Sequence, residues 1–225
     1  MKKYFLISLG VLLLNSCATT LLTDKDVSPA EVKNISYHEP ISFINLIEKG
    51  NQAKLNDSLS HVSTVILDSI IKNSGHPKVS KRLDVTEQKL KMRLENDLLK
   101  TVSEIRKVNK LEAVKTTALM DSVVKSENQR FALFVINSGF ARRKNNYGNQ
   151  IVKGIGVGIL TMGMYTPVPI KATTSTYAMI YDAQKSSVVF FNYLPAIERS
   201  PVDKKNMSNI YSLLFDKFYN AEKNR

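Results

Sequence analysis

Cysteine is almost missing from this chain of 225 residues, and tryptophan is missing altogether. The one cysteine, Cys17, ends an N-terminal apolar run, so the rest of the chain cannot form a disulfide. The three histidines, His38, His61 and His76, stand far apart, whereas a zinc site needs several ligands at close spacing. The sequence therefore predicts no disulfide framework, no metal and no cofactor. Stability has to come from a hydrophobic core, for which the chain is long enough.

The motifs of common hydrolases are missing as well. No G-x-S-x-G, S-x-x-K or H-x-x-E-H pattern occurs. Paired carboxylates for sugar chemistry meet only in the folded protein, and Glu39, Asp182 and Glu198 are the candidates. Asp182 stands at the start of a short polar connection, where an aspartate commonly bonds the backbone of the turn. We predict a protein without catalytic activity, with a hydrolase of glycan or peptide as a less favoured alternative.

The first seventeen residues carry a targeting signal. Two lysines precede the uncharged apolar run 4–14, which is shorter than a membrane-spanning helix, and Leu14-Asn15-Ser16-Cys17 follows it. This order resembles the signal peptide and lipobox of bacterial lipoproteins. The resemblance implies removal of residues 1–16 and attachment of lipid to Cys17. Because Ala18 is not the aspartate that resembles an inner-membrane retention signal, we expect the outer membrane, and its periplasmic face rather than the cell surface.

The chain is basic, with a formal net charge of +12. Such a balance suits nucleic acid, anionic lipid or an acidic polymer. An exported protein rarely meets nucleic acid, so no nucleic-acid partner is expected. The cations are spread along the chain, with 142–144 as the only run of three. This spread favours solvated surface charge, and lipid headgroups or a cell-wall polymer remain as alternative partners.

The first half of the chain is predicted to be mainly helical. Residues 17–34 have no periodicity and indicate a flexible tether. A strand over 35–47 is broken or edged by Pro40. Helices are predicted over 57–75, 86–107 and 112–126.

Two of these helices have a defined apolar face. The first places Leu59, Val62, Val65, Ile66 and Ile70 together, and Gly75 stands where a helix-ending glycine belongs. Thr86 is the expected cap of the second helix. Its apolar side chains form a narrow stripe that consists of Leu90, Leu94, Leu98, Val102 and Ile105. We expect this stripe to pack on a sheet in preference to a partner helix.

After residue 130 the pattern changes to strands. The run 131–136 is almost wholly apolar, as in a strand buried on both faces, and 173–182 and 187–193 form a predicted hairpin. An amphipathic helix opens near 200. The order of elements predicts one α/β or α+β domain over 35–225, with a mixed sheet, covering helices and a helical insert.

The segment 150–170 is apolar and rich in glycine, with a single charge at Lys153. Its glycines and prolines argue against a membrane helix, and the glycine spacing argues against a dinucleotide loop. It fits a buried glycine-rich strand or hairpin arm, or alternatively an exposed apolar segment that touches a membrane or partner. The residues proposed for such contact are Gly154, Gly156, Gly158, Met162, Met164 and Tyr165.

Four stretches together resemble a known group of envelope proteins: SLSHVSTVILDSIIKNSG, FALFVINSG, STYAMIYDAQKSSVVFFN and the closing amphipathic helix. The layout is similar to lipoproteins related to the amino-terminal domain of TolB, which include curli-secretion-channel lipoproteins and lipoprotein activators of penicillin-binding proteins. The resemblance implies a non-enzymatic domain that binds partners, sometimes as an oligomer. The helical insert over 86–126 departs from that layout.

These observations lead to one functional hypothesis and one main alternative. We expect a lipid-anchored adaptor or assembly component that binds envelope proteins through a sheet edge or through 150–170. The alternative is an oligomeric subunit of a secretion pore, in which self-association replaces a foreign partner and the glycine-rich segment lines or enters the membrane.

Overall fold

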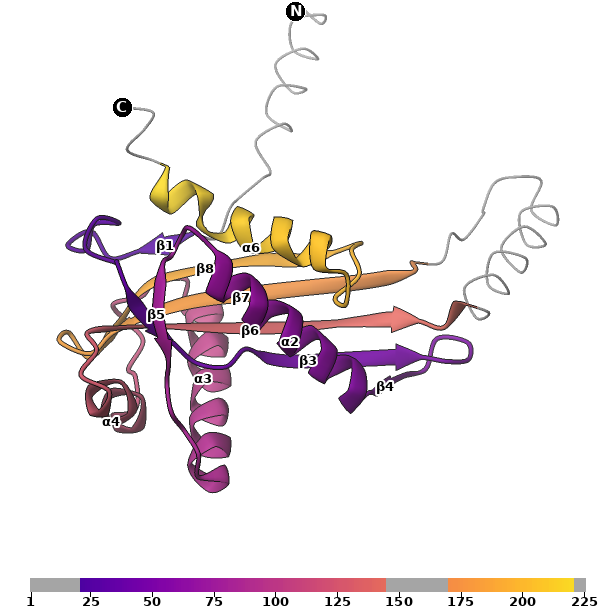
Figure 1. The fold of residues 1–225 in the computed structure, drawn as a ribbon, viewed down its shortest axis with the longest axis horizontal. Coiled ribbons are helices and arrows are strands. Elements are labelled where there is room, and N and C mark those ends of the chain that lie inside the picture. Colours follow the sequence, from indigo (N-terminus) through magenta and orange to yellow (C-terminus); the bar gives the residue numbers. More distant parts are fainter. Residues whose placement is uncertain (1–20, 145–169, 221–225) are drawn as a thin grey trace, which may run out of the picture.

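The computed structural model describes residues 21–144 and 170–220, which form a mixed eight-stranded sheet with helices on both faces (Figure 1). Its strands are β1 (Leu22–Thr23), β2 (Ile35–Tyr37), β3 (Ile41–Ile47), β4 (Ala53–Leu55), β5 (Val79–Arg82), β6 (Phe131–Arg142), β7 (Ala172–Asp182) and β8 (Ser187–Ile197). The helices are α2 (Asp57–Asn73), α3 (Gln88–Val108), α4 (Ala118–Ser126) and α6 (Lys204–Tyr219). The predicted α/β class with a mixed sheet and covering helices is confirmed.

The long strand β6 organises the sheet. It pairs with β7 in antiparallel fashion over almost its whole length, and its other edge is shared by β2 near the start and β3 further on. β2 and β3 are therefore two halves of one strand path, interrupted at Pro40. Proline has no backbone N–H to donate to a ladder, and the predicted break at this residue is confirmed. β8 and β1 extend the sheet beyond β7, and β5 and β4 extend it beyond β2 and β3.

One face of the sheet is covered by α2, which packs mainly on β3, and by α6, which lies beside α2 over β7 and β8 (Figure 1). Their apolar sides meet the sheet in an aromatic core. The Phe190 ring stacks on Phe215 with centroids 5.1 Å apart, and Phe218 packs against Phe190 at 5.0 Å. The run 131–136 is buried throughout, as predicted. The described residues contain no disulfide, so burial of these apolar side chains is a main source of stability.

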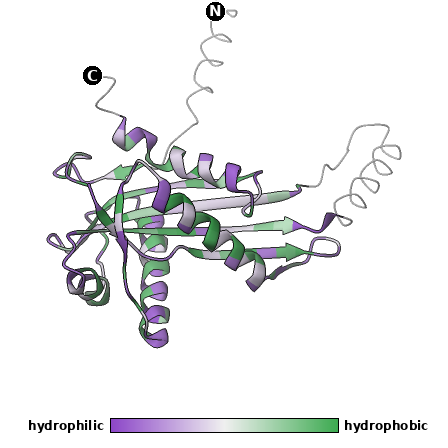
Figure 2. Cartoon of the chain, viewed as in Figure 1, coloured by the Kyte–Doolittle hydropathy of each residue, from purple (hydrophilic) through white to green (hydrophobic). Residues whose placement is uncertain are grey.

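The opposite face carries α3 and α4. Leu94, Leu98, Val102 and Ile105 pack with Phe134 and other sheet residues, so the predicted stripe does pack on the sheet. In Figure 2, green (hydrophobic) and purple (hydrophilic) residues alternate along α3. Leu90 is not buried with them and lies near the start of the helix.

The helix α2 begins at Asp57 as predicted, whereas α3 and α4 begin later than expected. The Asn56 side-chain oxygen accepts the Leu59 N–H at 2.9 Å and caps the start of α2. Ser74, in extended conformation, caps its end, so Gly75 stands directly after the cap, at the position the sequence predicted. Glu87, not Thr86, precedes α3. Thr117 caps α4, which is therefore shorter than the helix predicted from residue 112.

The apolar face predicted for α2 is wrong at two positions. Val62 and Val65 are 43% and 52% exposed. Ile70 is buried as predicted, together with Ser63, Leu67 and Ile71. The inward face is displaced because Ser63 joins a polar group in the sheet: it accepts a hydrogen bond from Asn137 at 2.9 Å.

The packed domain starts earlier than the sequence suggested. Of the residues expected to form a tether, those from 21 onwards lie against the sheet. Leu22 pairs with Phe191 in β1, and Val27 and Val32 are buried in the core under α2 and α6. These isolated apolar residues carry no periodicity, which is why sequence patterns missed them.

Candidate interaction surface

Among residues 21–144 and 170–220, no helix covers the α3 side of one half of the sheet. Along β7 the side chains of Ala172, Thr174 and Thr176 are buried, whereas the alternating Thr173, Ser175 and Tyr177 are partly exposed. Residues that alternate along a strand point to opposite faces. The open face consists of the partly exposed side chains on this side of β3, β6, β7 and β8: Phe43, Ser138, Phe140, Thr173, Ser175, Tyr177 and Tyr193.

The C-terminal half of α3 borders the open face and forms a hollow with it. The hollow has a volume of about 490 Å³ and is lined by aromatic, aliphatic, hydroxyl and cationic side chains. They are Phe43, Leu99, Val102, Ser103, Arg106, Lys107, Ile136, Ser138 and Tyr177. Ile105 is the last buried residue of the apolar stripe on α3. The next two residues, Arg106 and Lys107, therefore lie at the rim of the hollow.

Arg106 lies over two tyrosines of the open face. Its guanidinium carbon is 5.7 Å from the Tyr177 ring centre and 5.1 Å from that of Tyr193, and Nη1 donates to the Tyr177 hydroxyl at 3.4 Å. The two rings stack at 5.4 Å. Tyrosine and arginine combine a broad apolar surface with hydrogen-bonding groups, and both are enriched at protein interfaces.

The other side of the same strands is closed by a hydrogen-bonded polar group. Asn137 Oδ1 accepts from the hydroxyls of Thr174 at 2.7 Å and Thr176 at 2.9 Å, while its Nδ2 donates to Ser63 of α2. All four are buried. Because each of these polar side chains has a hydrogen-bond partner, their burial costs little free energy. We therefore assign this group a structural role.

A charged cleft of about 400 Å³ lies where β2 gives way to β3. Glu39 accepts from Lys91 at 2.6 Å and from Arg82 at 3.2 Å, and the bond from Lys91 is the main cause of its lowered pKa. His38 is buried, and this burial lowers its pKa to about 4. Its Nδ1–H donates to the Glu39 carbonyl oxygen at 2.7 Å. The ion pairs and this bond hold the strand junction together.

The carboxylates considered for hydrolysis do not meet. Asp182 pairs with Ser187 at one end of the β7–β8 hairpin, and Glu198 follows Ile197, which pairs with Thr174 near the other end. Eight strand residues separate the two levels, which is about 26 Å, whereas glycosidase carboxyls lie within roughly 10 Å. Glu39 lies in the charged cleft on a third strand path.

Asp182 has the structural role that its sequence position predicted. Its Oδ1 accepts the Gln184 N–H at 2.8 Å, which fixes the turn, and Oδ2 accepts from Arg130 at 2.9 Å. The carboxylate is fully buried. A buried, paired carboxylate that bonds its own turn is not placed to receive a substrate.

Two features are absent from the described part of the chain. Residues 21–144 and 170–220 contain no group of three or more His, Cys, Asp or Glu arranged to hold a metal. In the same residues no helix is both long enough and apolar enough to cross a membrane. Cys17 and the proposed contact residues Gly154, Gly156, Gly158, Met162, Met164 and Tyr165 lie outside the described residues, so these predictions stay predictions.

Sequence reasoning missed the open face, although two signals pointed to it. Tyr177 follows four consecutive polar residues, 173–176, and such a stretch in a predicted strand indicates a part of the sheet outside the apolar core. Arg106 follows the last apolar residue of the α3 stripe. The pairing of β3 with the far half of β6, which brings Phe43 to this face, was not readable from local patterns.

No family model and no curated protein matches the sequence. Solved structures do match. The LpoB C-terminal domain from Salmonella enterica has 10% identity and a TM-score of 0.31, covering 78% of this chain and 87% of that one. A PelC dodecamer from Paraburkholderia phytofirmans has 8% identity and a TM-score of 0.37, covering 88% of this chain and 94% of that one. The LpoB C-terminal domain from Escherichia coli has 10% identity and a TM-score of 0.29, covering 74% and 84%. The chain is similar to these proteins in a partial layout of elements.

Proposed function

We propose that this protein is a lipid-anchored, non-enzymatic component of the cell envelope that binds another envelope protein on its open face. Cys17 is the lipid attachment site, and the outer membrane, on its periplasmic side, is the location. The single observation that carries the binding function is the hollow between α3 and the sheet, where Arg106 lies over Tyr177 and Tyr193.

The chemistry of the open face indicates what it binds. Aromatic rings offer a flat apolar surface, and the hydroxyls of Ser138 and Ser175 offer hydrogen bonds beside it. Arg106 and Lys107 add positive charge at the rim. The best-fitting ligand is a protein segment that presents an apolar or aromatic side chain with a carboxylate close by.

Photo-cross-linking in intact cells tests this proposal. A photoreactive amino acid at Ser175 places the probe on the open face, and the same amino acid at Ser208, an exposed position of α6, is the matched control. We expect one abundant envelope partner to be linked from Ser175 and not from Ser208. The same experiment with Cys17→Ala should lose the link, because the protein no longer stays at the membrane.

Two outcomes would decide otherwise. A ladder of self-links from Ser175 would favour the alternative, an oligomeric secretion-pore subunit, in which a second copy occupies the open face. Equal links from Ser175 and Ser208, or none from either, would show that the open face is not a binding surface.

A further inference from the structure

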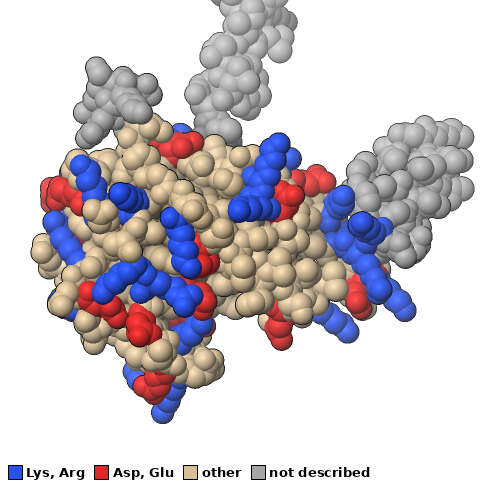
Figure 3. Space-filling model, in the orientation of Figure 1, with Lys and Arg blue, Asp and Glu red and all other residues tan. Residues whose placement is uncertain are grey.

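One end of the sheet is strongly basic. β3 ends there, β4 and β7 begin there, and β6 runs out into the cationic run that sequence analysis noted. The basic tip comprises residues 46–55, 141–144 and 170–172. Its charged side chains are six cations and a single carboxylate: Lys49, Lys54, Arg142, Arg143, Lys144, Lys171 and Glu48. Figure 3 shows Lys and Arg side chains gathered at the right-hand end of the domain.

Arg142 builds the tip without losing its charge. Its guanidinium donates to the Gly50 carbonyl at 2.8 Å, the Asn51 side-chain oxygen at 2.8 Å and the Ile170 carbonyl at 2.7 Å. These three neutral acceptors tie the β3–β4 turn to the start of β7. Because none is a carboxylate, the tip is held in shape and its positive charge is not cancelled.

The other cations of the tip are largely uncompensated. Glu48 lies 3.8 Å from Arg143, and both side chains are well exposed, so their attraction is weak. Asp57, in the first turn of α2, is the next carboxylate along the chain. Glu198 and Arg199, which directly follow β8, carry opposite charges and add no net charge. The tip therefore keeps a clear excess of positive charge.

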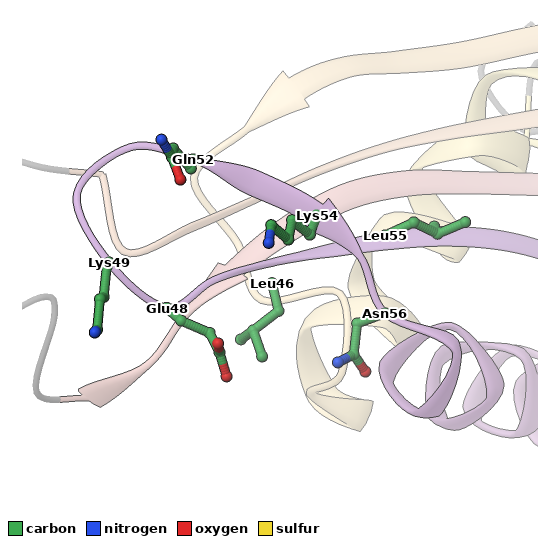
Figure 4. Close-up of a pocket in the computed structure, with 7 residues that line it drawn as sticks. All are labelled: Leu46, Glu48, Lys49, Gln52, Lys54, Leu55 and Asn56. Atoms are coloured by element: carbon green, nitrogen blue, oxygen red, sulfur yellow. The ribbon is translucent and has the colours of Figure 1, made fainter.

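Exposed apolar side chains lie among these cations. Leu55 is 58% exposed and Ile170 is 44% exposed. A shallow hollow of about 310 Å³ opens between the β3–β4 hairpin and the start of α2, with Leu46 beside Glu48 and Lys54 above them (Figure 4). Lysines mixed with exposed leucine and isoleucine at one end of a domain are typical of surfaces that enter a membrane interface.

We propose that the basic tip docks on a membrane surface of anionic phospholipid, independently of the partner bound at the open face. Each Lys or Arg gains from the negative potential of the headgroups, and Leu55 and Ile170 enter the boundary between headgroups and acyl chains. An acidic protein or polysaccharide would satisfy the cations alone and leave these two side chains in water. A lipid surface satisfies both, and is therefore the favoured occupant.

Vesicle binding tests the tip. The protein from residue 17 onwards carries Cys17→Ala, so that no lipid anchor contributes, and is mixed with vesicles of phosphatidylcholine alone or with phosphatidylglycerol. We expect binding only when phosphatidylglycerol is present. Lys49→Glu with Lys54→Glu should weaken it by more than tenfold, since each cation contributes roughly fivefold at such a surface. Lys204→Glu with Lys205→Glu, the same charge change on exposed residues of α6, is the matched control and should weaken binding far less.

Two further arms separate lipid from other anions. Leu55→Ser should lower the binding that remains at high salt, where screening removes most of the charge term. Soluble polyglutamate should compete poorly with the vesicles. Equal losses in the two lysine pairs, binding to phosphatidylcholine alone, or full displacement by polyglutamate would overturn the proposal. A pair of Lys→Gln changes at 49 and 54 repeats the test with smaller risk to folding.

Discussion

The two halves of the sheet use the same strands for different purposes. In the half that contains residues 131–136, β6 is buried on both faces, between the core under α2 and α6 and the core under α3 and α4. In the other half, α2 still covers the face on which the Asn137 side chain lies. The face on the α3 side is the open face. One half holds the fold together, and the other presents a surface.

The difference lies in the side chains that continue each strand. Phe134 and Ile136 of β6 meet α3, whereas Ser138 and Phe140 follow on the same side with no equivalent burial. A domain stabilised by a closed half can leave aromatic side chains in the other half for binding, because losing them costs the core little. Stability and binding should therefore respond to different substitutions.

The largest effect is expected from a core phenylalanine. Phe190→Ala removes a ring stacked on Phe215 and should lower the free energy of unfolding by about 3–5 kcal/mol. Phe140→Ala makes the same change on the open face and should cost only about 1 kcal/mol. Urea unfolding followed by circular dichroism measures both. Similar losses for the two variants would contradict the division of the sheet.

A smaller effect is expected from pH at the junction of the two halves. Burial lowers the pKa of His38 from 6.5 to about 4, so the folded protein holds this ring neutral while the unfolded chain takes up a proton. The stability is fully present above pH 6.5 and is lost as the pH falls towards 4, by about 3 kcal/mol in total.

Unfolding in urea between pH 7 and 5.5 checks this, because in that range a carboxylate with a lowered pKa, such as Glu39, stays largely charged in the folded and the unfolded state. His38→Gln cannot take up a proton there and should flatten the pH dependence. His61→Gln, on the exposed side of α2, should keep it. An unchanged slope in His38→Gln would assign the dependence to another group.

Next in size is the close approach of β6 and β7 in the open half. A Cβ added at Gly139 would lie 2.1 Å from the Thr173 carbonyl oxygen, so the backbone of β7 has to move. Gly139→Ala should destabilise by about 1–3 kcal/mol. Ser138→Ala, one residue earlier on the exposed side, is the control and should have almost no effect on the urea midpoint. A tolerated alanine at 139 would mean that β7 is easily displaced.

The closed half was largely predictable from sequence and the open half was not. Continuous apolar runs and helix stripes give local signals, so the strand 131–136, α3 and α6 were placed within a few residues. The Asp182 turn was also predictable, because an aspartate at a hairpin start bonds its own backbone. The predicted cap of α3 failed, because the helix begins after Glu87, one residue beyond Thr86, and its start has no side-chain capping bond.

Long-range pairing explains what local patterns missed. The open face exists because β3 pairs with 136–142 of β6, while β2 pairs with its first residues. The inward side of α2 is set by the bond between Asn137 and Ser63, which are 74 residues apart. Neither contact has a signature within a short window. Arg106 likewise acquires its two tyrosines only when α3 meets β7 and β8.

The smallest effect on stability should accompany the clearest effect on binding. Arg106→Ala removes a partly solvated cation from two tyrosine rings, which costs about 0.5–1 kcal/mol of unfolding free energy. The same change removes the charged rim of the hollow, so the partner linked from Ser175 should fall severalfold in yield. Arg93→Ala, an exposed arginine of the same helix, is the matched control and should alter neither quantity.

A large loss of stability in Arg106→Ala would make this arginine part of the fold, and unchanged cross-linking would remove the open face as the binding site. A small loss of stability with a large loss of partner is the result that only a binding surface explains.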